Sequence, residues 1–338
     1  MRRLLLLLAA TQAYELCIGQ DAGSILNYTA AFGPPACVMS YASLTNLTAA
    51  LWTGTEYGSG VEDASALLKA LPETTALQLG LWLVGVEEDV LSGAYDDELG
   101  ELLGFMRWAA PRRIFIRIGY EFDSPQNAYE PALFKQAYAK VADKLKGEPN
   151  VYRVWHSWSF PETYNGHTFD EWWPGADKVD VCGISVFQQA YGDNELGDFT
   201  VARDIAKFCR LHKKPLMIAE STPFGVGDAE PRSTIWARWY VPVLKFIREE
   251  NVVLWSYIND DWDAQKMWSR NGLVWGDSRV EAHPDLAAHW RREVLVPRPL
   301  LVAEARAGGR RVAGAALVGI LLFAVPWLRK ASCVSPAW

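Results

Sequence analysis

The chain has 338 residues, and half of them are hydrophobic, which is enough for one large domain or two small ones with a substantial core. Residues 14–300 hold 26 of the 33 Lys and Arg and 39 of the 40 Asp and Glu, a formal charge of −13. An acidic body argues against nucleic acid or anionic polymers as partners, whereas a neutral polysaccharide suffers no such repulsion. The 16 Trp residues supply flat apolar surface that stacks on sugar rings but also fills cores.

The N-terminal residues 1–13 have the pattern of a secretory signal. Arg2 and Arg3 precede an apolar run, and small residues follow it up to Ala13. An uncleaved membrane anchor is the alternative, and the run is too short to span a bilayer. Two glycosylation sequons, at Asn27 and Asn46, fit a secretory route if the source is eukaryotic.

From residue 14 onward, apolar strand-like runs alternate with helix-like segments. The runs lie at 15–20, 35–41, 76–84, 113–120, 151–157, 179–187, 215–220 and 252–258. Apolar residues at helical spacing occupy 61–71, 95–109, 131–146, 200–212, 232–250 and 284–294. Eight such units over residues 14–300 predict a single α/β domain, a (β/α)8 TIM barrel. A doubly wound sheet is the rival fold, and it is disfavoured because no Gly-rich phosphate loop follows the first strand. The second and fifth crossovers have the least clear pattern.

The C-terminal part of the chain predicts a membrane anchor. Residues 303–311 form a short linker, and residues 312–328 are uncharged and apolar, at the short end of a spanning helix. A basic pair, Arg329-Lys330, opens a tail over 329–338. A lipid-anchor signal is the alternative, which the charged tail disfavours. With a cleaved signal, the prediction is a monomeric, single-pass type I membrane glycoprotein whose body is extracellular or lumenal.

Two glutamates stand where buried strands end and polar loops begin. Glu121 follows the strand of 113–120, and Glu220 ends the strand of 215–220. In a barrel of parallel strands, catalytic groups collect at the C-terminal strand ends, and these two ends lie across the mouth. One carboxyl can protonate a leaving oxygen while the other attacks a sugar carbon, as in retaining glycosidases, where the pair lies about 5–5.5 Å apart. For Glu121, an ordinary acidic loop residue is the alternative.

Three segments cover the ends of predicted strands: Arg117-Ile-Gly-Tyr-Glu121, Val179-Asp-Val-Cys-Gly-Ile-Ser-Val-Phe187 and Lys214-Pro-Leu-Met-Ile-Ala-Glu220. They resemble motifs of glycoside hydrolase family 26. The resemblance implies a retaining (β/α)8 enzyme, in a family that includes β-mannanases and relatives acting on β-1,3-xylan and mixed-linkage β-glucan. It also implies Glu121 as the acid/base, Glu220 as the nucleophile and Trp255 as the floor under the sugar at the cleavage point. Arg117 matches the Arg that stands four residues before the acid/base.

Several positions depart from the family pattern. Tyr120 replaces His before the acid/base, and Asp123 stands where Asn is common. Phe187 replaces the Tyr that hydrogen-bonds the nucleophile, and Ser185 replaces a nearby Asp. Because Phe187 has no hydroxyl, another group must orient Glu220, and Tyr120 and Gln188 are the candidates.

Further residues at the expected strand ends are candidates for binding sugar. Amide side chains suit sugar hydroxyls because they both donate and accept hydrogen bonds. The predicted substrate-binding residues are Arg117, Tyr120, Asp123, Tyr129, His156, Trp158, Gln188, Trp255, Asn259 and Asp261. His156 is either a ligand to substrate or to Glu121, or a packed core residue. Asp21 and Tyr41 are additional candidates, and Trp172, Trp173, Trp268 and Trp275 are either sugar platforms or core residues.

No cofactor is expected, and no metal site is implied, because the five His residues form no HExxH or HxH pair. A Ser-His-Asp hydrolase is unsupported because no GxSxG motif occurs. The five Cys residues are too scattered for a disulfide scaffold, and one oxidised pair remains open.

The sequence therefore predicts a membrane-anchored, endo-acting retaining glycosidase that cleaves a β-linked polysaccharide. The first alternative is a non-catalytic glycan-binding ectodomain on a degenerate barrel. A transmembrane glycosyltransferase is the third hypothesis, and Asp260-Asp261 is its nearest approach to a metal motif.

Overall fold

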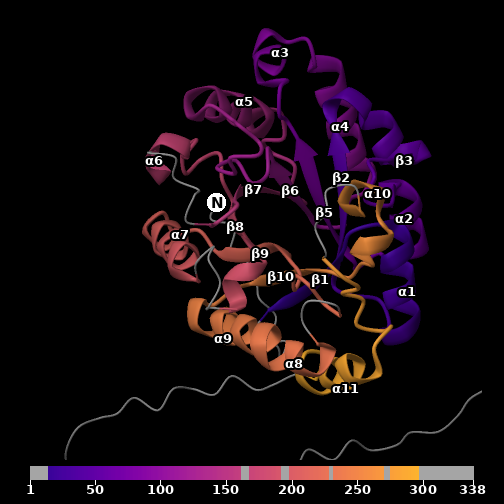
Figure 1. The fold of residues 1–338 in the computed structure, drawn as a ribbon. Coiled ribbons are helices and arrows are strands. Elements are labelled where there is room, and N and C mark those ends of the chain that lie inside the picture. Colours follow the sequence, from indigo (N-terminus) through magenta and orange to yellow (C-terminus); the bar gives the residue numbers. More distant parts are fainter. Residues whose placement is uncertain (1–13, 161–166, 192–197, 228–230, 270–274, 297–338) are drawn as a thin grey trace, which may run out of the picture. The chain divides into compact units, whose positions relative to one another are not determined.

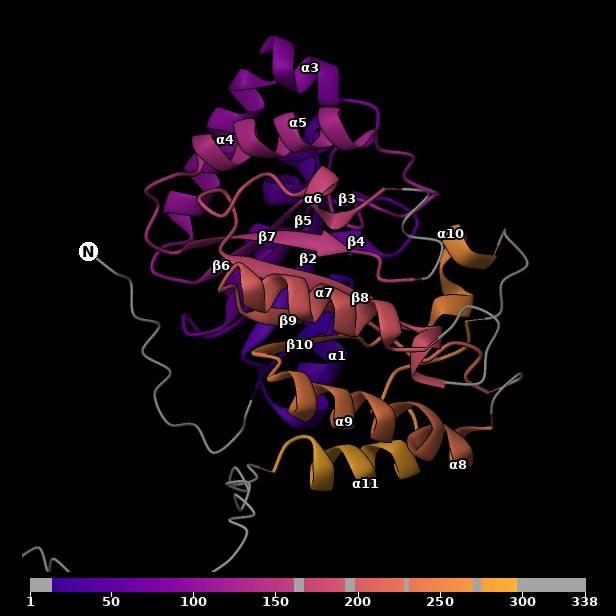
Figure 2. The ribbon, with the colours of Figure 1, turned by 90° about the vertical axis from the view of Figure 1, so that its left-hand side faces the viewer.

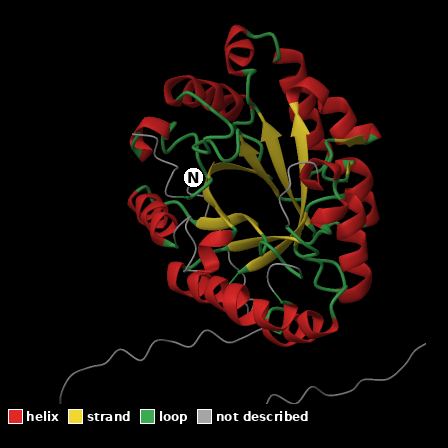
Figure 3. Ribbon diagram, viewed as in Figure 1, coloured by secondary structure: helices red, strands yellow, loops and turns green. Residues whose placement is uncertain are grey.

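A computed structural model of the chain describes residues 14–160, 167–191, 198–227, 231–269 and 275–296. Within these residues, eight parallel strands close into a barrel inside a ring of helices (Figure 1; Figure 3, strands in yellow). The strands are β1 (Glu15–Gly19), β2 (Cys37–Ser43), β5 (Ala76–Trp82), β6 (Ile114–Ile118), β7 (Val151–Ser157), β8 (Val181–Val186), β9 (Leu216–Ser221) and β10 (Leu254–Ile258). They pair in chain order, and β10 closes the barrel on β1. The predicted (β/α)8 barrel is confirmed.

Helices cover the outer face of the barrel (Figures 1 and 2). They are α1 (Ala22–Phe32), α2 (Ala64–Ala70), α3 (Glu87–Ser92), α4 (Asp96–Trp108), α5 (Pro131–Lys144), α6 (Phe169–Trp172), α7 (Thr200–Leu211), α8 (Arg232–Ile235), α9 (Val241–Glu250) and α11 (Pro284–Glu293). The short α10 (Lys266–Ser269) lies instead in the loop after β10, where the Met267 N–H donates to the carbonyl of Gly58. The helix expected over 232–250 is interrupted by a wider turn, Trp236–Tyr240. Pro242, which lacks an N–H, lies in the first turn of α9 and prevents regular helical bonding there.

The second and fifth crossovers, which lacked a clear pattern, carry little helix. After β2 come short helical turns and an antiparallel hairpin of β3 (Thr55–Glu56) and β4 (Val61–Glu62), and only then α2. After β7, the described residues contain only the four-residue α6 before β8. In the second crossover, α2 lies within the helix-like segment predicted over 61–71, and the residues before it form the hairpin and short turns.

Side chains along each strand alternate between the barrel interior and the helical shell. On β6, Ile114, Ile116 and Ile118 belong to the large core between strands and helices, whereas Phe115 belongs to the interior cluster. Arg117 follows Phe115 at an inward position and is fully buried. The strand is therefore apolar toward its helices and directs a cation into the barrel.

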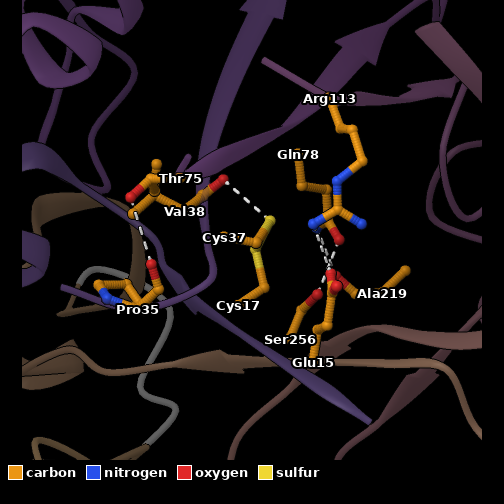
Figure 4. The surroundings of a disulfide bond; sticks show 10 residues. All are labelled: Glu15, Cys17, Pro35, Cys37, Val38, Thr75, Gln78, Arg113, Ala219 and Ser256. Carbon is orange, nitrogen blue, oxygen red and sulfur yellow. Dashed lines mark hydrogen bonds and ion pairs between the residues drawn. A yellow bond between two sulfur atoms is a disulfide. The ribbon is translucent and has the colours of Figure 1, made fainter. Parts of the chain in front are cut away.

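Polar contacts cross the barrel interior near its first disulfide (Figure 4). Gln78 on β5 donates to the carbonyl of Ala219 on β9 at 2.7 Å and accepts from the hydroxyl of Ser256 on β10 at 2.7 Å. At the starting ends of the strands, Arg113 forms an ion pair with Glu15 at 2.8 Å. These contacts tie together strands that are not neighbours in the sheet.

Two disulfides are present among the described residues, whereas the sequence suggested at most one oxidised pair without identifying its partners. Cys17–Cys37 joins β1 to β2 inside the barrel, and Cys182–Cys209 joins β8 to α7. Their sequence separations of 20 and 27 residues match no recognisable spacing, so only the fold brings the partners together.

The predicted signal (1–13), linker (303–311), membrane span (312–328) and tail (329–338) lie outside the described residues. Within the part of the chain that the structure describes, no helix has both the length and the apolar character that crossing a bilayer requires.

Candidate active site

The turn after β6 carries the first glutamate. Gly119 and Glu121 both have positive φ, of 57° and 50°. A Cβ on Gly119 would lie 2.9 Å from the ring of Phe134, so both conformation and space favour glycine there. Glu121 adopts the left-handed conformation without that freedom, and such strain in a non-glycine residue is typical of functional positions.

The second glutamate depends on an irregularity in β9. Ile184 of β8 pairs with Ile218, but Ser185 pairs with Glu220, so the register shifts by one residue. Ala219 belongs to the interior cluster, and Glu220 after it also lines the cavity at the barrel mouth. A regular strand would place these consecutive side chains on opposite faces, and the shift brings both inward.

Glu220 is held by two donors from other strands. Arg117 on β6 forms an ion pair with its Oε1, and the Tyr41 hydroxyl on β2 donates to the same oxygen at 3.0 Å. The carboxylate side chain is only 10% exposed. Both donors hold this oxygen in one position, and a nucleophile must be fixed in this way relative to the carbon it attacks.

Arg117 is itself enclosed by aromatic rings. Its guanidinium carbon lies 4.8 Å from the ring centres of both Tyr41 and Tyr120. A Cβ on Gly80 would come within 2.7 Å of Nη2, so glycine leaves the space for the cation. Burial is the largest single effect and would lower the pKa of Arg117. The charge and hydrogen bond of Glu220, together with Tyr41 and Tyr120, outweigh it and raise the pKa, so the guanidinium stays charged.

Glu121 experiences a different environment from Glu220. The Ser185 hydroxyl donates to Glu121 Oε1 at 2.5 Å. Burial, and then the charge of Glu220, raise the pKa of Glu121 to about 8, against smaller opposing effects of Ser185 and Arg117. At neutral pH, Glu121 therefore keeps its proton, which is the form that a general acid requires.

Both glutamates line one cavity of about 970 Å³. Many aromatic side chains line its walls, namely Tyr41, Tyr57, Trp82, Tyr120, Trp158, Phe160, Phe187, Phe224, Trp262, Trp268 and Trp275. Its polar lining includes Gln20, Gln126, Asn127 and Gln188. Aromatic faces with a few amides suit a ligand that has both apolar ring faces and hydroxyl groups.

Three predicted binding residues, Tyr120, Trp158 and Gln188, lie on the cavity wall, and their contact with substrate stays a prediction. Trp268 and Trp275 also lie there. Trp172 and Trp173 instead pack in the core, where Trp173 contacts Trp155 edge to face at 5.0 Å between ring centres.

Trp255, expected to form the floor under the sugar, is fully buried on the opposite face of the barrel wall. It packs against Trp290 of α11 at 5.4 Å between ring centres, and its indole N–H donates to Ser221. This placement contradicts the expected role. Trp262, after the end of β10, lines the cavity and stacks on Trp275 at 5.1 Å.

Four other predicted binding residues do not line the cavity. Asp123 accepts hydrogen bonds from the Ser157 hydroxyl and the Trp158 backbone, and Tyr129 accepts one from the Leu83 backbone. Asn259 donates to Glu281 and accepts from Val280, and Asp261 forms an ion pair with Arg279. These residues support the loops around the mouth. The candidate Asp21 likewise caps α1, where its carboxylate accepts from two backbone N–H groups.

His156 is fully buried beneath the cavity wall. Its Nε2 lies 3.0 Å from Ser185 Oγ, and its Nδ1 lies 3.4 Å from Arg117 Nη1. Burial, and then the Arg117 charge, lower the pKa of His156 far below its usual value, so the ring is neutral. His156 does not line the cavity, and it reaches Glu121 only through Ser185. The geometry therefore supports an indirect effect on Glu121 and not a contact with substrate.

Two contributors to the site were not assigned by the sequence. Tyr41 donates to Glu220, whereas Tyr120 and Gln188 were the expected candidates. Glu62 in the β4 hairpin accepts from the Ser40 hydroxyl at 2.7 Å and the Tyr41 backbone at 3.1 Å. Tyr41 was already a candidate from its place near the end of β2, and only its contact with Glu220 was not foreseen, whereas Glu62 lies in the second crossover and was not considered. Among the described residues, no group of three or more His, Cys, Asp or Glu side chains is placed to hold a metal ion.

Comparison with known proteins gives relatives in sequence and in structure, although no protein-family model matches. A curated β-1,3-xylanase of a Vibrio species is 30% identical over 317 residues, which cover 86% of this chain and 66% of that protein. A second β-1,3-xylanase, of an Alcaligenes species, is 29% identical over 321 residues, covering 86% and 65%. The chain thus spans just under two thirds of the length of these relatives.

The fold is shared with solved mannanase structures. A family 26 β-mannanase of Bacteroides ovatus superposes with a TM-score of 0.56 at 13% identity, over 83% of this chain and 88% of that one. The catalytic domain of a family 26 endo-β-1,4-mannanase of a Bacillus species gives 0.53 at 13% identity, over 82% and 85%. The sequence of this chain is similar to β-1,3-xylanases, and its barrel is similar to family 26 mannanases. The chain therefore resembles the (β/α)8 enzymes of glycoside hydrolase family 26.

Proposed function

We propose that the chain is a retaining glycoside hydrolase that cleaves a β-linked polysaccharide, with Glu121 as acid/base and Glu220 as nucleophile. The observation that carries the proposal is the pairing of two glutamates in one cavity with opposite electrostatic environments. Arg117 forms an ion pair with Glu220 and Tyr41 donates to the same oxygen, while burial and the charge of Glu220 keep Glu121 protonated at neutral pH. Such a pair is the requirement for double displacement.

In the first step, a Glu220 carboxylate oxygen attacks the anomeric carbon, and the bond from that carbon to the leaving glycosidic oxygen breaks. Glu121 gives its proton to the leaving oxygen, so no alkoxide has to form. The result is a glycosyl ester on Glu220, a free reducing-side fragment and an ionised Glu121.

In the second step, Glu121 takes a proton from water as the water oxygen attacks the same anomeric carbon. The ester bond to Glu220 breaks, and its electron pair returns to the carboxylate, which Arg117 and Tyr41 again stabilise. Two inversions give net retention, and both glutamates end in their starting protonation states.

The substrate class follows from the cavity wall and from the relatives. Aromatic rings such as Trp158, Trp262 and Trp275 offer stacking faces, and Gln188 offers an amide for hydroxyl groups. A net acidic body suits a neutral polymer. The names of the two curated relatives make β-1,3-xylan the first substrate to test, followed by β-1,4-mannan and mixed-linkage β-glucan.

We also propose that the protein follows the secretory route and is anchored by the apolar segment 312–328. Both disulfides support passage through an oxidising compartment, because cytosolic proteins seldom keep them. The sequon residues Asn27 and Asn46 are both exposed, which glycosylation requires. Alkaline extraction of membranes and glycosidase treatment of the expressed full chain test anchoring and glycosylation separately.

The experiment for the enzymatic proposal uses the full chain on the three polysaccharides, with product analysis. Glu220→Ala should abolish turnover, and azide should restore activity on an activated aryl glycoside through an α-glycosyl azide. Glu56→Gln is the matched control, because Glu56 is exposed on β3 and lies outside the cavity. Full activity of Glu220→Ala refutes the nucleophile assignment, and polysaccharide binding without any product by the wild-type chain supports the glycan-binding alternative.

A further inference from the structure

Three side chains connect the two glutamates by continuous contacts. Arg117 Nη1 contacts both Glu220 Oε1 and His156 Nδ1, the latter at 3.4 Å. His156 Nε2 lies 3.0 Å from Ser185 Oγ, which lies 2.5 Å from Glu121 Oε1. Arg117, His156 and Ser185 are each fully buried. The connection therefore runs through the protein wall beneath the cavity.

The chemistry of the groups gives this connection a direction. Arginine only donates, so His156 Nδ1 must accept, since an N–H there would face the Arg117 donors. The low pKa of His156 makes the ring neutral, so its single proton lies on Nε2 and is donated to Ser185 Oγ. The Ser185 hydroxyl then has its own hydrogen free to donate to Glu121 Oε1. Every donor in the series, from Arg117 to Ser185, points toward the acid/base.

We propose that Ser185 and His156 are positioning residues that select which oxygen of Glu121 carries the catalytic proton. Because Oε1 is occupied as an acceptor, the proton resides on Oε2, which is left to deliver it to the leaving oxygen. The inference rests on the proposed function, in which Glu121 is the acid/base. Since the same guanidinium nitrogen also holds Glu220, the orientations of the two carboxyl groups are fixed by one shared contact.

The charges around Glu121 show what the hydrogen bond from Ser185 contributes. Glu220 on β9 and Asp123 on its own turn both favour the neutral acid, while Arg117 on β6 and the Ser185 hydroxyl on β8 favour the carboxylate. Burial dominates all of these effects and raises the pKa of Glu121 to about 8. Without the Ser185 hydrogen bond, the pKa should rise further and both oxygens become equivalent carriers of the proton.

The test measures the Glu121 carboxyl directly by NMR titration of protein with isotope-labelled glutamate, using Glu121→Gln to assign the signal. Ser185→Ala should raise the pKa of Glu121 by about one to two pH units, the expected effect of losing a hydrogen bond to a charged group. Ser185→Thr, which keeps the hydroxyl, should return it toward the wild-type value. His156→Leu should shift it in the same direction as Ser185→Ala, and His156→Gln, which keeps an N–H near the Nε2 position, should reverse that shift.

Kinetics give an independent readout. On the polysaccharide, Ser185→Ala should lose at least about tenfold in kcat/KM, because protonation of a poor leaving group is impaired. On a dinitrophenyl glycoside, which needs no acid, the loss should stay within about threefold. If Ser185→Ala changes the pKa of Glu121 by less than about 0.3 pH units, or loses equal activity on both substrates, the positioning role of Ser185 and His156 is refuted. Absence of wild-type activity on every substrate would instead refute the proposed function, and the NMR titration would still test whether Ser185 and His156 position the proton of Glu121.

Discussion

The hydroxyl of Tyr41 offers the sharpest test of how Glu220 is held. Tyr41→Phe removes the 3.0 Å hydrogen bond to Glu220 Oε1 but keeps the ring beside Arg117 and Tyr120. A hydrogen bond to a charged group contributes about 1.5–3 kcal/mol, and we take the lower value because Arg117 still donates to the same oxygen. Since about 1.4 kcal/mol is tenfold in rate, kcat/KM should fall by roughly tenfold.

The assay is kcat/KM on the polysaccharide that the wild-type chain cleaves best, together with thermal unfolding. Stability should stay within about 1 kcal/mol of wild type, because the ring contacts remain. Tyr152→Phe is the matched control, since Tyr152 lies near the start of β7, at the opposite end of the barrel. A loss below about twofold, or an equal loss in Tyr152→Phe, would show that the Tyr41 hydroxyl does not support Glu220.

Three further outcomes follow from the site. Glu121 must be protonated to act as an acid, so kcat/KM should fall as pH rises through about 8, and an unchanged rate up to pH 10 would contradict the acid assignment. Trp255→Phe should lower the unfolding temperature and leave KM unchanged, because the Trp255 ring is in the core. Trp262→Ala should raise KM several-fold, because Trp262 lines the cavity. A rise in KM for Trp255→Phe with no rise for Trp262→Ala would show that Trp255, and not Trp262, contacts the substrate. Burial raises the pKa of Glu62 from 4.5 to about 8. The stability that depends on neutral Glu62 is therefore fully present below pH 4.5 and is lost as the pH rises through 8. The total loss in the free energy of unfolding is at most about 5 kcal/mol. Glu62→Gln should therefore unfold at a higher temperature than wild type at pH 9 and at a similar one at pH 4, and parallel pH profiles of the two proteins would refute this.

The strands could be predicted because a parallel barrel buries both of their faces. Each becomes a short apolar run, and all eight predicted runs agree with the observed strands to within two residues at each end. The same property hides which face each residue takes. Trp255 and Leu254 are equally apolar neighbours, yet Leu254 points into the barrel and Trp255 into the helical shell.

The contacts within the site could be predicted only in part. Glu121 and Glu220 are visible in the sequence because each is a lone acid at the end of an apolar run. Ser185, His156 and Tyr41 come from three other strands, and nothing local to them indicates that they meet. Their contacts depend on strand order and register, which only the closed sheet determines.

The shifted pairing at the end of β9 has a consequence for anyone who would rebuild this barrel. The register shift leaves Ala219 unpaired and lets both Ala219 and Glu220 face inward, so the reactive oxygen is located by backbone spacing as well as by side-chain choice. Regular pairing of the same residues, with Ala219 retained, would keep the whole composition yet rotate the acid into the helical layer. A transplant of this chemistry onto another scaffold must carry the irregular stretch along with its glutamate.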